Sequence, residues 1–324
     1  MTHTAYITHP DCLLHDNGIT HPERPQRLRV IREALLNAGL MDRLHLPRAP
    51  EATDEQLARV HTQRHIEHIR AQAPGPGQQV MLDADTSMNE HSLSAALRAA
   101  GAAVEGVRQV IEEEIDSAFC AVRPPGHHAE RDRAMGFCLF NNVAVGAAHA
   151  LEHHGLARVA IADFDVHHGN GTEDIFRDDP RVLYCSSFQH PFYPGLPLAQ
   201  RDHLVHTPLP AGTDGPAFRA AIRRDWLPAL EAFRPELVLI SAGFDAHHDD
   251  FLAGLGLWED DYAWITGQLM DVAARHARGR LVSVLEGGYD LESLAHSVTA
   301  HVCTLLEEDC GRRRRGQQLR ADHG

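Results

Sequence analysis

The sequence predicts a single α/β domain in which helices cover both faces of a mostly parallel sheet. Three observations support this prediction: short apolar segments recur along the chain, amphipathic segments lie between them, and polar residues follow the apolar segments. Strands that helices cover on both faces read as nearly continuous apolar runs. The 324 residues show no repeat of fixed period and no Ser- or Gly-rich linker in the middle of the chain. This pattern favours one domain over two.

The expected strands are six segments in which Val, Ile and aromatic residues, which favour strands, are common. In chain order they are TAYIT near the start, SAFCAV at 117–122, RVAIADFDV at 158–166, RVLYCSS at 181–187, ELVLISAGFD at 236–245 and RLVSVLEGG at 280–288. The expected helices are the amphipathic stretches 92–114, 141–155, 217–232, 259–276 and 291–306. Because strands alternate with helices, we expect parallel βαβ units.

The composition disfavours nucleic acid and membranes as partners. The net charge is −15, whereas phosphate binding needs a clustered basic surface. The basic run 312–315 lies in a C-terminal segment, 311–324, which we expect to be a flexible Arg-rich tail. The N-terminus MTHTAYITHPDC has no apolar signal core, and no apolar run reaches the length of a membrane span. We therefore expect a cytoplasmic protein, and a homo-oligomer stays open.

Polar side chains gather where four of the expected strands end. These ends read RPPGHH, DFDVHHGNG, AGFDAHH and EGGYD. In open parallel sheets, ligands bind outside the carboxyl ends of the strands. The sequence therefore predicts one functional site at this edge of the sheet.

The segment DFDVHHG has the residue types and the spacing of a metal site. Asp163, Asp165 and His167 are two residues apart, so along a strand they project to the same face. Asp245 ends another strand, and Gly243 before it permits a close approach. Two carboxylates, one imidazole and an open position are typical of catalytic zinc. The alternative interpretation is a strand end with solvated polar residues.

Acid–base and electrophilic groups accompany this metal site. Two aspartates neutralise the charge of Zn²⁺, so we expect a second electrophile, for which Tyr289 after two glycines is the candidate. His127 and His128 would carry protons, tuned by partners such as Asp163 and Asn170. Adjacent histidines also arise by chance in a chain with 25 histidines.

Taken in this order, RPPGHH, GFCLFNN, DFDVHHGNGT, FYPG, SAGFDAH and LEGGY resemble the motifs of the histone deacetylase family. With HPERPQRL and DADTSMNEHS they look most like its class II-related bacterial members, a group that includes acetylpolyamine amidohydrolases. The resemblance implies the arginase-like fold, with three layers and a mostly parallel eight-stranded sheet. We expect it to form one catalytic domain over residues 1–310.

The resemblance also implies residue roles. The ligands of one zinc ion per chain would be Asp165, His167 and Asp245. The acid–base group would comprise His128 as general base and acid, His127 as its electrostatic partner, Asp163 behind His127, Asn170 as in the class II-like branch, and Tyr289 as the oxyanion donor. A structural potassium ion would bind Asp163, Asp165, His167 and Ser186.

The resemblance also implies substrate contacts, of which those of Asp85 and Arg27 rest on looser motifs. A narrow tunnel for an acylated amine would be lined by Gly136, Phe137 and Tyr193. Asp85 would hold the substrate backbone at the rim, and Arg27 would lie below the site. Leu252 stands where polyamine-selective relatives place a glutamate, and an apolar residue there argues against a cationic polyamine.

The sequence thus predicts a zinc-dependent amidohydrolase that uses metal-activated water to remove acetyl or other short acyl groups from lysine side chains of proteins or peptides. One alternative is a deacetylase of acetylpolyamines or other small N-acyl amines. Another is a catalytically idle module that binds acyl-lysine or a metal. A second metal on His247, His248, Asp249 and Asp250 is a further alternative, although a polar surface loop explains these residues equally well.

Overall fold

A parallel sheet forms the centre of the protein. The computed structural model describes residues 3–307, so the expected Arg-rich tail, 311–324, lies outside the described residues. Seven strands within them lie in the order β1-β4-β9-β8-β5-β6-β7, and each neighbouring pair is parallel. The strands are β1 (Thr4–Ile7), β4 (Ser117–Cys120), β5 (Val159–Asp163), β6 (Val182–Gln189), β7 (Leu204–Leu209), β8 (Leu237–Ala242) and β9 (Leu281–Leu285). The predicted parallel sheet is confirmed.

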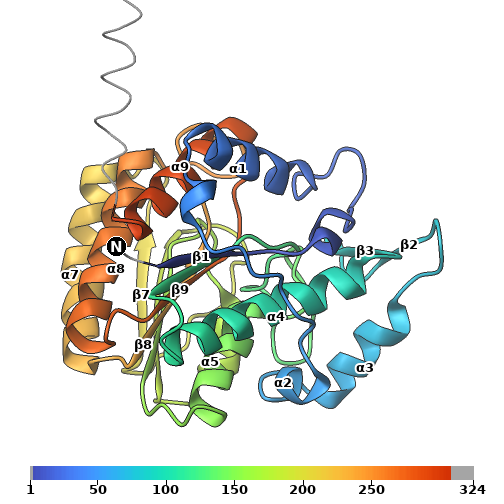
Figure 1. Ribbon diagram of the computed structural model, residues 1–324, viewed down its shortest axis with the longest axis horizontal. Helices are drawn as coiled ribbons and strands as arrows, with labels where there is room; N and C mark the ends of the chain where they lie inside the picture. The colour runs from blue at the N-terminus through green and yellow to red at the C-terminus, as the bar shows by residue number, and fades with distance from the viewer. Residues whose placement is uncertain (1–2, 308–324) are drawn as a thin grey trace, which may run out of the picture.

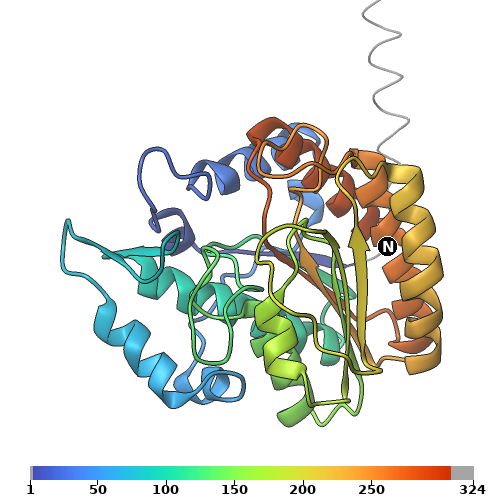
Figure 2. The same cartoon turned by 180° about the vertical axis from the view of Figure 1, so that it is seen from behind.

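Helices cover both faces of this sheet, as expected. The longer helices are α1 (Gln26–Asn37), α3 (Gln63–Gln72), α4 (Ser92–Ile111), α5 (Asn142–Glu152), α7 (Gly215–Phe233), α8 (Glu259–His276) and α9 (Leu291–Leu305). Helices α4 and α5 pack on one face, and α7 and α8 on the other, where α9 and α1 extend the layer (Figures 1 and 2). None of the helices within residues 3–307 combines the length and the apolar character that a membrane span requires.

Shorter elements connect these layers and form the start of the chain. They are η1 (Pro10–Leu13), η2 (Met41–Arg43), α2 (Asp54–Ala58), α6 (Asn170–Phe176) and the antiparallel pair β2 (Gln79–Met81) and β3 (Ser87–Asn89). Side chains of the residue types that favour helix starts cap several helices, among them Asn141 for α5, Asp214 for α7 and Asp290 for α9.

The expected count of eight strands is wrong for the described residues, which form seven in the main sheet. Residues 45–49 run beside β1, where His45 donates to Thr4 and Ala49 donates to Thr8. The next donor along this ladder would be the N–H of residue 47, which is proline. Proline has no N–H, so the segment makes isolated bridges to β1 in place of a strand.

One strand of the main sheet, β7, is not among the six segments that the apolar pattern predicts. It lies at the edge of the sheet beside β6 and reads LVHTPL. Several of its side chains are partly exposed, because only one neighbour covers an edge strand. Its mixed polarity therefore hides it from a search for continuous apolar runs.

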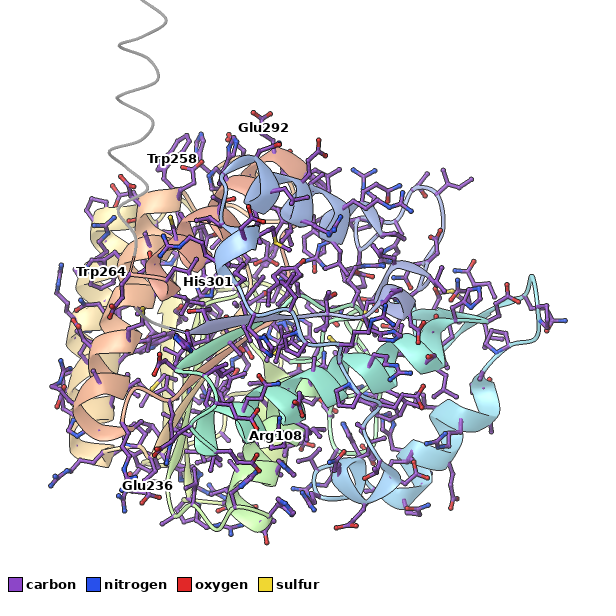
Figure 3. The ribbon with its side chains drawn as sticks, in the orientation of Figure 1. Arg108, Glu236, Trp258, Trp264, Glu292 and His301 are labelled. Carbon is purple, nitrogen blue, oxygen red and sulfur yellow. The ribbon has the colours of Figure 1, made fainter. Side chains whose placement is uncertain are left out.

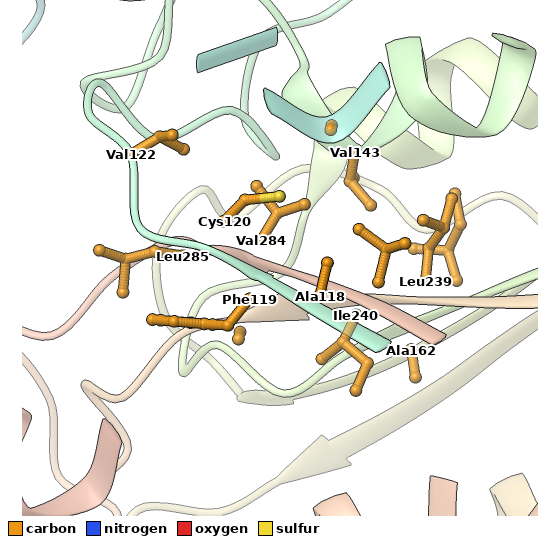
Figure 4. Packing of buried hydrophobic residues seen from close by; sticks show 14 of the residues in the cluster. Ala118, Phe119, Cys120, Val122, Val143, Ala162, Leu239, Ile240, Val284 and Leu285 are labelled. Atoms are coloured by element: carbon orange, nitrogen blue, oxygen red, sulfur yellow. The ribbon is translucent and has the colours of Figure 1, made fainter. Parts of the chain in front are cut away.

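The core packs against both faces of the sheet. Phe119 of β4, Ile240 of β8 and Val143 of α5 are fully buried in one cluster (Figure 4). Trp258 and Glu292 mark the starts of α8 and α9, and Glu236 precedes the start of β8. Figure 3 shows Trp258 and Glu292 at the end of the molecule opposite to Glu236. The N-termini of these helices therefore lie at the same edge as the carboxyl end of β8.

Candidate active site

The four polar strand ends meet at one edge of the sheet. Strands β4, β9, β8 and β5 are consecutive neighbours in the sheet, although they are far apart in sequence. The loops after them carry, in that order, the histidine pair, Tyr289, Asp245 and the Asp165–His167 segment. The predicted gathering of functional side chains at the carboxyl edge is therefore what the strand order produces.

Asp165, His167 and Asp245 form a buried cluster. Their candidate ligand atoms all lie within 4.8 Å of one another. Nδ1 of His167 is 3.0 Å from Oδ1 of Asp165 and 3.3 Å from Oδ2 of Asp245. Burial and repulsion by the negative charge of Asp165 raise the pKa of Asp245 to about 6. A cation between them would relieve this repulsion.

The surroundings of the cluster fit a divalent metal ion. Oδ2 of Asp245 is buried and has no hydrogen-bond partner among the described residues. The other oxygens are held in place, because the backbone N–H groups of Val166 and Gly287 donate to Asp245 Oδ1 and Asp165 Oδ2 at 2.9 and 2.8 Å. An unpartnered buried carboxylate oxygen is costly, and metal coordination would satisfy it.

Two glycines leave the space that these carboxylates occupy. A Cβ atom on Gly243 would lie 2.1 Å from Asp165 Oδ2, and one on Gly287 would lie 1.9 Å from Asp245 Oδ2. Both distances are far below van der Waals contact. Any side chain at either position would displace a candidate metal ligand.

His127 and His128 lie beside the cluster with ring centroids 4.0 Å apart. Nδ1 of His127 donates to Asp163 Oδ2 at 2.9 Å, and Nδ1 of His128 donates to Asn170 Oδ1 at 2.8 Å. The Asn170 amide nitrogen donates to Glu130 at 2.8 Å, which turns its oxygen toward His128. Each histidine therefore has the partner that the sequence suggested for the pair.

The two histidines differ in their preferred charge. Burial opposes a charge on His127, but the carboxylates of Asp163 and Asp165 outweigh it and hold the pKa of His127 well above its usual range. Burial, together with positive charge on His127 and His167, holds the pKa of His128 well below its usual range. One ring thus favours the imidazolium form, whereas the other stays neutral with a free Nε2 lone pair.

Glu286 supports the histidine pair, and the sequence analysis missed it. Its Oε2 accepts hydrogen bonds from the backbone N–H groups of Gly126 and His127 at 2.7 and 3.1 Å. Burial raises the pKa of Glu286 to about 7. Its position could have pointed to it, because Glu286 directly follows the buried strand β9 and is the first residue of the polar strand end EGGYD.

Tyr289 follows the glycine pair after β9, and it is buried. The Arg27 guanidinium lies 5.0 Å from the Tyr289 ring centroid. Arg27 also donates from Nε to the carbonyl oxygen of Gly288 at 2.6 Å. The arginine expected below the site is therefore packed directly under the loop that carries Tyr289.

Aromatic side chains flank the same region. The Phe137 ring meets Tyr289 edge to face at 5.9 Å, and the Tyr193 ring meets His128 in the same way at 5.1 Å. Gly136 and Phe137 both have positive φ, 56° and 70°, and a Cβ atom on Gly136 would lie 2.5 Å from the His128 ring. The structure also stacks Phe192 on His167, a contact that the sequence analysis missed.

The remaining predicted residues lie around this centre. Asp85 is partly exposed, and its Oδ1 accepts from the Gly136 N–H at 3.2 Å. Ser186 pairs in register with Asp163 across β6 and β5. Leu252 is partly buried, and its N–H donates to Asp250 at 3.0 Å.

The second metal site considered on residues 247–250 does not form. Within the described residues, the groups that could hold a metal are His149 with His153 and His154, His168 with Glu173 and His206, and the Asp165 cluster, and residues 247–250 are not among them. In the first group, the His149 and His153 rings stack with planes only 12° apart. An imidazole nitrogen binds a metal in the plane of its ring, and two stacked, nearly parallel rings share no such position. In the second, Glu173 accepts from His168 and His206 at 2.9 and 2.6 Å, which satisfies these groups without a metal.

Comparison with known proteins identifies the family. The sequence matches the histone deacetylase domain over residues 21–305. The chain belongs to the histone deacetylase family. It is 42% identical over 279 residues to a histone deacetylase-like amidohydrolase of Pseudomonas aeruginosa, covering 83% of this chain and 72% of that protein. It is 41% identical over 309 residues to an uncharacterised protein of Synechocystis sp., covering 93% and 99%.

A solved structure of the histone deacetylase family supports the fold. The crystal structure of the HDA15 HD domain matches with a TM-score of 0.89 and 36% identity, covering 95% of this chain and 90% of that chain. The expected arginase-like α/β fold is thereby confirmed. Family membership and the amidohydrolase relative support a deacetylase, which is a hydrolase.

Proposed function

We propose that this protein is a zinc-dependent amidohydrolase that removes acetyl or other short acyl groups from lysine side chains of proteins or peptides. The observation that carries the proposal is the unequal histidine pair beside the buried cluster of Asp165, His167 and Asp245. A base that is neutral next to a partner that favours its charged form suits hydrolysis. An idle binding module has no need of this difference.

The three cluster residues would hold the metal, which when bound acidifies a water molecule and polarises an amide carbonyl. His128 would take the proton from the attacking water and later give it to the departing amine. His127, charged and anchored by Asp163, would stabilise the negative charge that develops nearby. Tyr289 would donate its hydroxyl hydrogen to the oxyanion of the tetrahedral intermediate.

Substrate contacts, a second ion and the context of the enzyme complete the proposal. Phe137 and Tyr193 would form the walls of a tunnel with Gly136 beside it, and Asp85 would hold the substrate backbone at the rim. A structural potassium ion would bind oxygens of Asp163, Asp165, His167 and Ser186. We also propose one zinc ion per chain, a single catalytic unit over residues 1–310 and a cytoplasmic location.

Hydrolysis of an acetyl-lysine peptide tests the proposal. The wild type should release acetate, and Tyr289→Phe and Asp165→Ala should each lower the rate by about 10² or more. Zinc content should stay at one equivalent in Tyr289→Phe and fall in Asp165→Ala. Equal turnover in all three proteins would refute the proposal, and a large preference for acetylputrescine would favour the small-amine alternative.

A further inference from the structure

The loop that carries Tyr289 is flexible by sequence but anchored in the structure. Gly287 and Gly288 precede Tyr289, and Gly288 has a φ of 120°, a conformation that side-chain-bearing residues rarely adopt. Arg27 fixes the glycines from one side by donating to the carbonyl oxygens of Glu286 and Gly288. These contacts leave the N–H groups of Tyr289 and of the residue after it to be satisfied elsewhere.

Asp250 accepts both of these N–H groups. Its Oδ2 lies 2.6 Å from the Tyr289 nitrogen and 3.1 Å from the Asp290 nitrogen. The carboxyl group is buried, with 4% of the residue exposed. Hydrogen bonds to a buried carboxylate are about twice as strong as bonds between neutral groups. Asp250 is therefore a fixed anchor for the backbone of Tyr289.

The same carboxylate also holds its own loop. Its Oδ1 accepts the N–H of Leu252 at 3.0 Å. Asp250 and Tyr289 are 39 residues apart in sequence, so one side chain joins the loop that carries Leu252 to the loop that carries Tyr289. Its two oxygens are occupied by backbone donors, so Asp250 has a role that neither a solvated surface loop nor the alternative second metal explains.

We propose that Asp250 is a positioning residue, which holds Tyr289 in place relative to the metal ligands and couples it to the loop that carries Leu252. The catalytic part of this inference rests on the proposed function. The physical basis is that small displacements of an oxyanion donor are costly: a misplacement of about 1 Å can lower a rate about 10²-fold. Substrate binding depends less on the Tyr289 hydroxyl, so kcat should respond more than KM.

Steady-state kinetics on the acetyl-lysine peptide tests the coupling. Asp250→Ala removes both acceptor oxygens, so the hydrogen bonds from the N–H groups of Leu252, Tyr289 and Asp290 are all lost. We expect kcat to fall roughly 10- to 100-fold with little change in KM. In a Tyr289→Phe background, the same substitution should have little further effect, because the hydroxyl that Asp250 positions is already absent.

A matched control separates positioning from general destabilisation. Asp261 is another buried aspartate that accepts a backbone N–H, from Trp258 at 3.0 Å, at the start of α8. Asp261→Ala should leave kcat within about twofold of wild type at a temperature where it is folded. A drop in kcat equal to that of Asp250→Ala, or a full additional loss in the Tyr289→Phe background, would overturn the proposal.

Hydrogen exchange gives a readout that needs no substrate. In Asp250→Ala, the amides of Tyr289 and Asp290 should exchange at least tenfold faster than in wild type, whereas strand β9 should keep its protection. Unchanged exchange at both amides would overturn the proposal even if activity fell. If the wild type hydrolysed no acyl-lysine, the proposed function would fail, and the exchange rates would still decide whether Asp250 anchors Tyr289. Should Asp250→Ala not fold, Asp250→Ser serves for both measurements.

Discussion

His127 donates a hydrogen bond from Nδ1 to Asp163 across 2.9 Å, and this contact distinguishes it from its neighbour. His128 faces the neutral amide of Asn170 instead. The two rings are nearly in contact, yet their pKa values move in opposite directions. Adjacent residues of the same type therefore differ in the charge that they prefer, because each meets a different partner.

We expect His128→Ala to abolish turnover more completely than His127→Ala. Loss of the general base should lower kcat by about 10² or more, whereas loss of His127 removes only an electrostatic contribution. Rates on the acetyl-lysine peptide, measured at equal zinc content, check this order. The reverse order would assign the base to His127.

Gly287→Ala should lower metal content. The new Cβ atom would lie 1.9 Å from Asp245 Oδ2, so a candidate ligand must move. Zinc per chain, measured by elemental analysis after dialysis, should fall below that of wild type. As the control, Gly267→Ala in α8 places its Cβ no closer than 3.9 Å to Thr304, and it should keep the metal and gain up to about 1 kcal/mol in stability. Full zinc occupancy in Gly287→Ala would contradict the expected ligand geometry.

The free energy of unfolding should fall as the pH drops below about 6.5. Burial lowers the pKa of His61 and of His301 to about 3 from an ordinary value of 6.5. Between these values the unfolded chain binds protons that the folded protein excludes, so each histidine should contribute a slope of about 1.4 kcal/mol per pH unit.

Urea unfolding of the metal-free protein between pH 4 and pH 7 measures this slope. His301 is held by Thr266 and Ser283 at 2.6 and 2.9 Å. His301→Gln should be less stable at neutral pH, but its stability should depend less steeply on pH, by about one proton. An unchanged slope would show that His301 is not the group responsible.

Leu252→Glu should shift the substrate preference toward cationic amines. A carboxylate at this partly buried position would attract the ammonium groups of an acetylpolyamine. The ratio of kcat/KM for acetylputrescine to that for the acetyl-lysine peptide should rise about tenfold or more, and high salt should reduce the shift. Leu36→Glu, an exposed position on α1, is the control that should leave the ratio unchanged. No shift in Leu252→Glu would place Leu252 outside the substrate path.

Several features of the site follow from local sequence alone. The alternation of apolar strands and amphipathic helices predicts a parallel sheet, and in such a sheet the strand ends must share an edge. Asp165, His167 and Asp245 can therefore be grouped by their positions at strand ends, and the fold brings their ligand atoms together. The number of strands could not be predicted as well. Pro47 leaves the segment beside β1 with isolated bridges only, and the mixed polarity of β7 hides that strand from a search for apolar runs.

The sequence by itself determined the residue types at each strand end and hence the class of site. Only the tertiary structure decided which partners these residues meet: Glu286 under His127, Phe192 on His167 and Asp250 at the backbone of Tyr289. Glu286 and His127 are 159 residues apart. They meet because β9 lies beside β4 in the sheet. Strand order is set by the packing of the whole chain, and no local pattern records it.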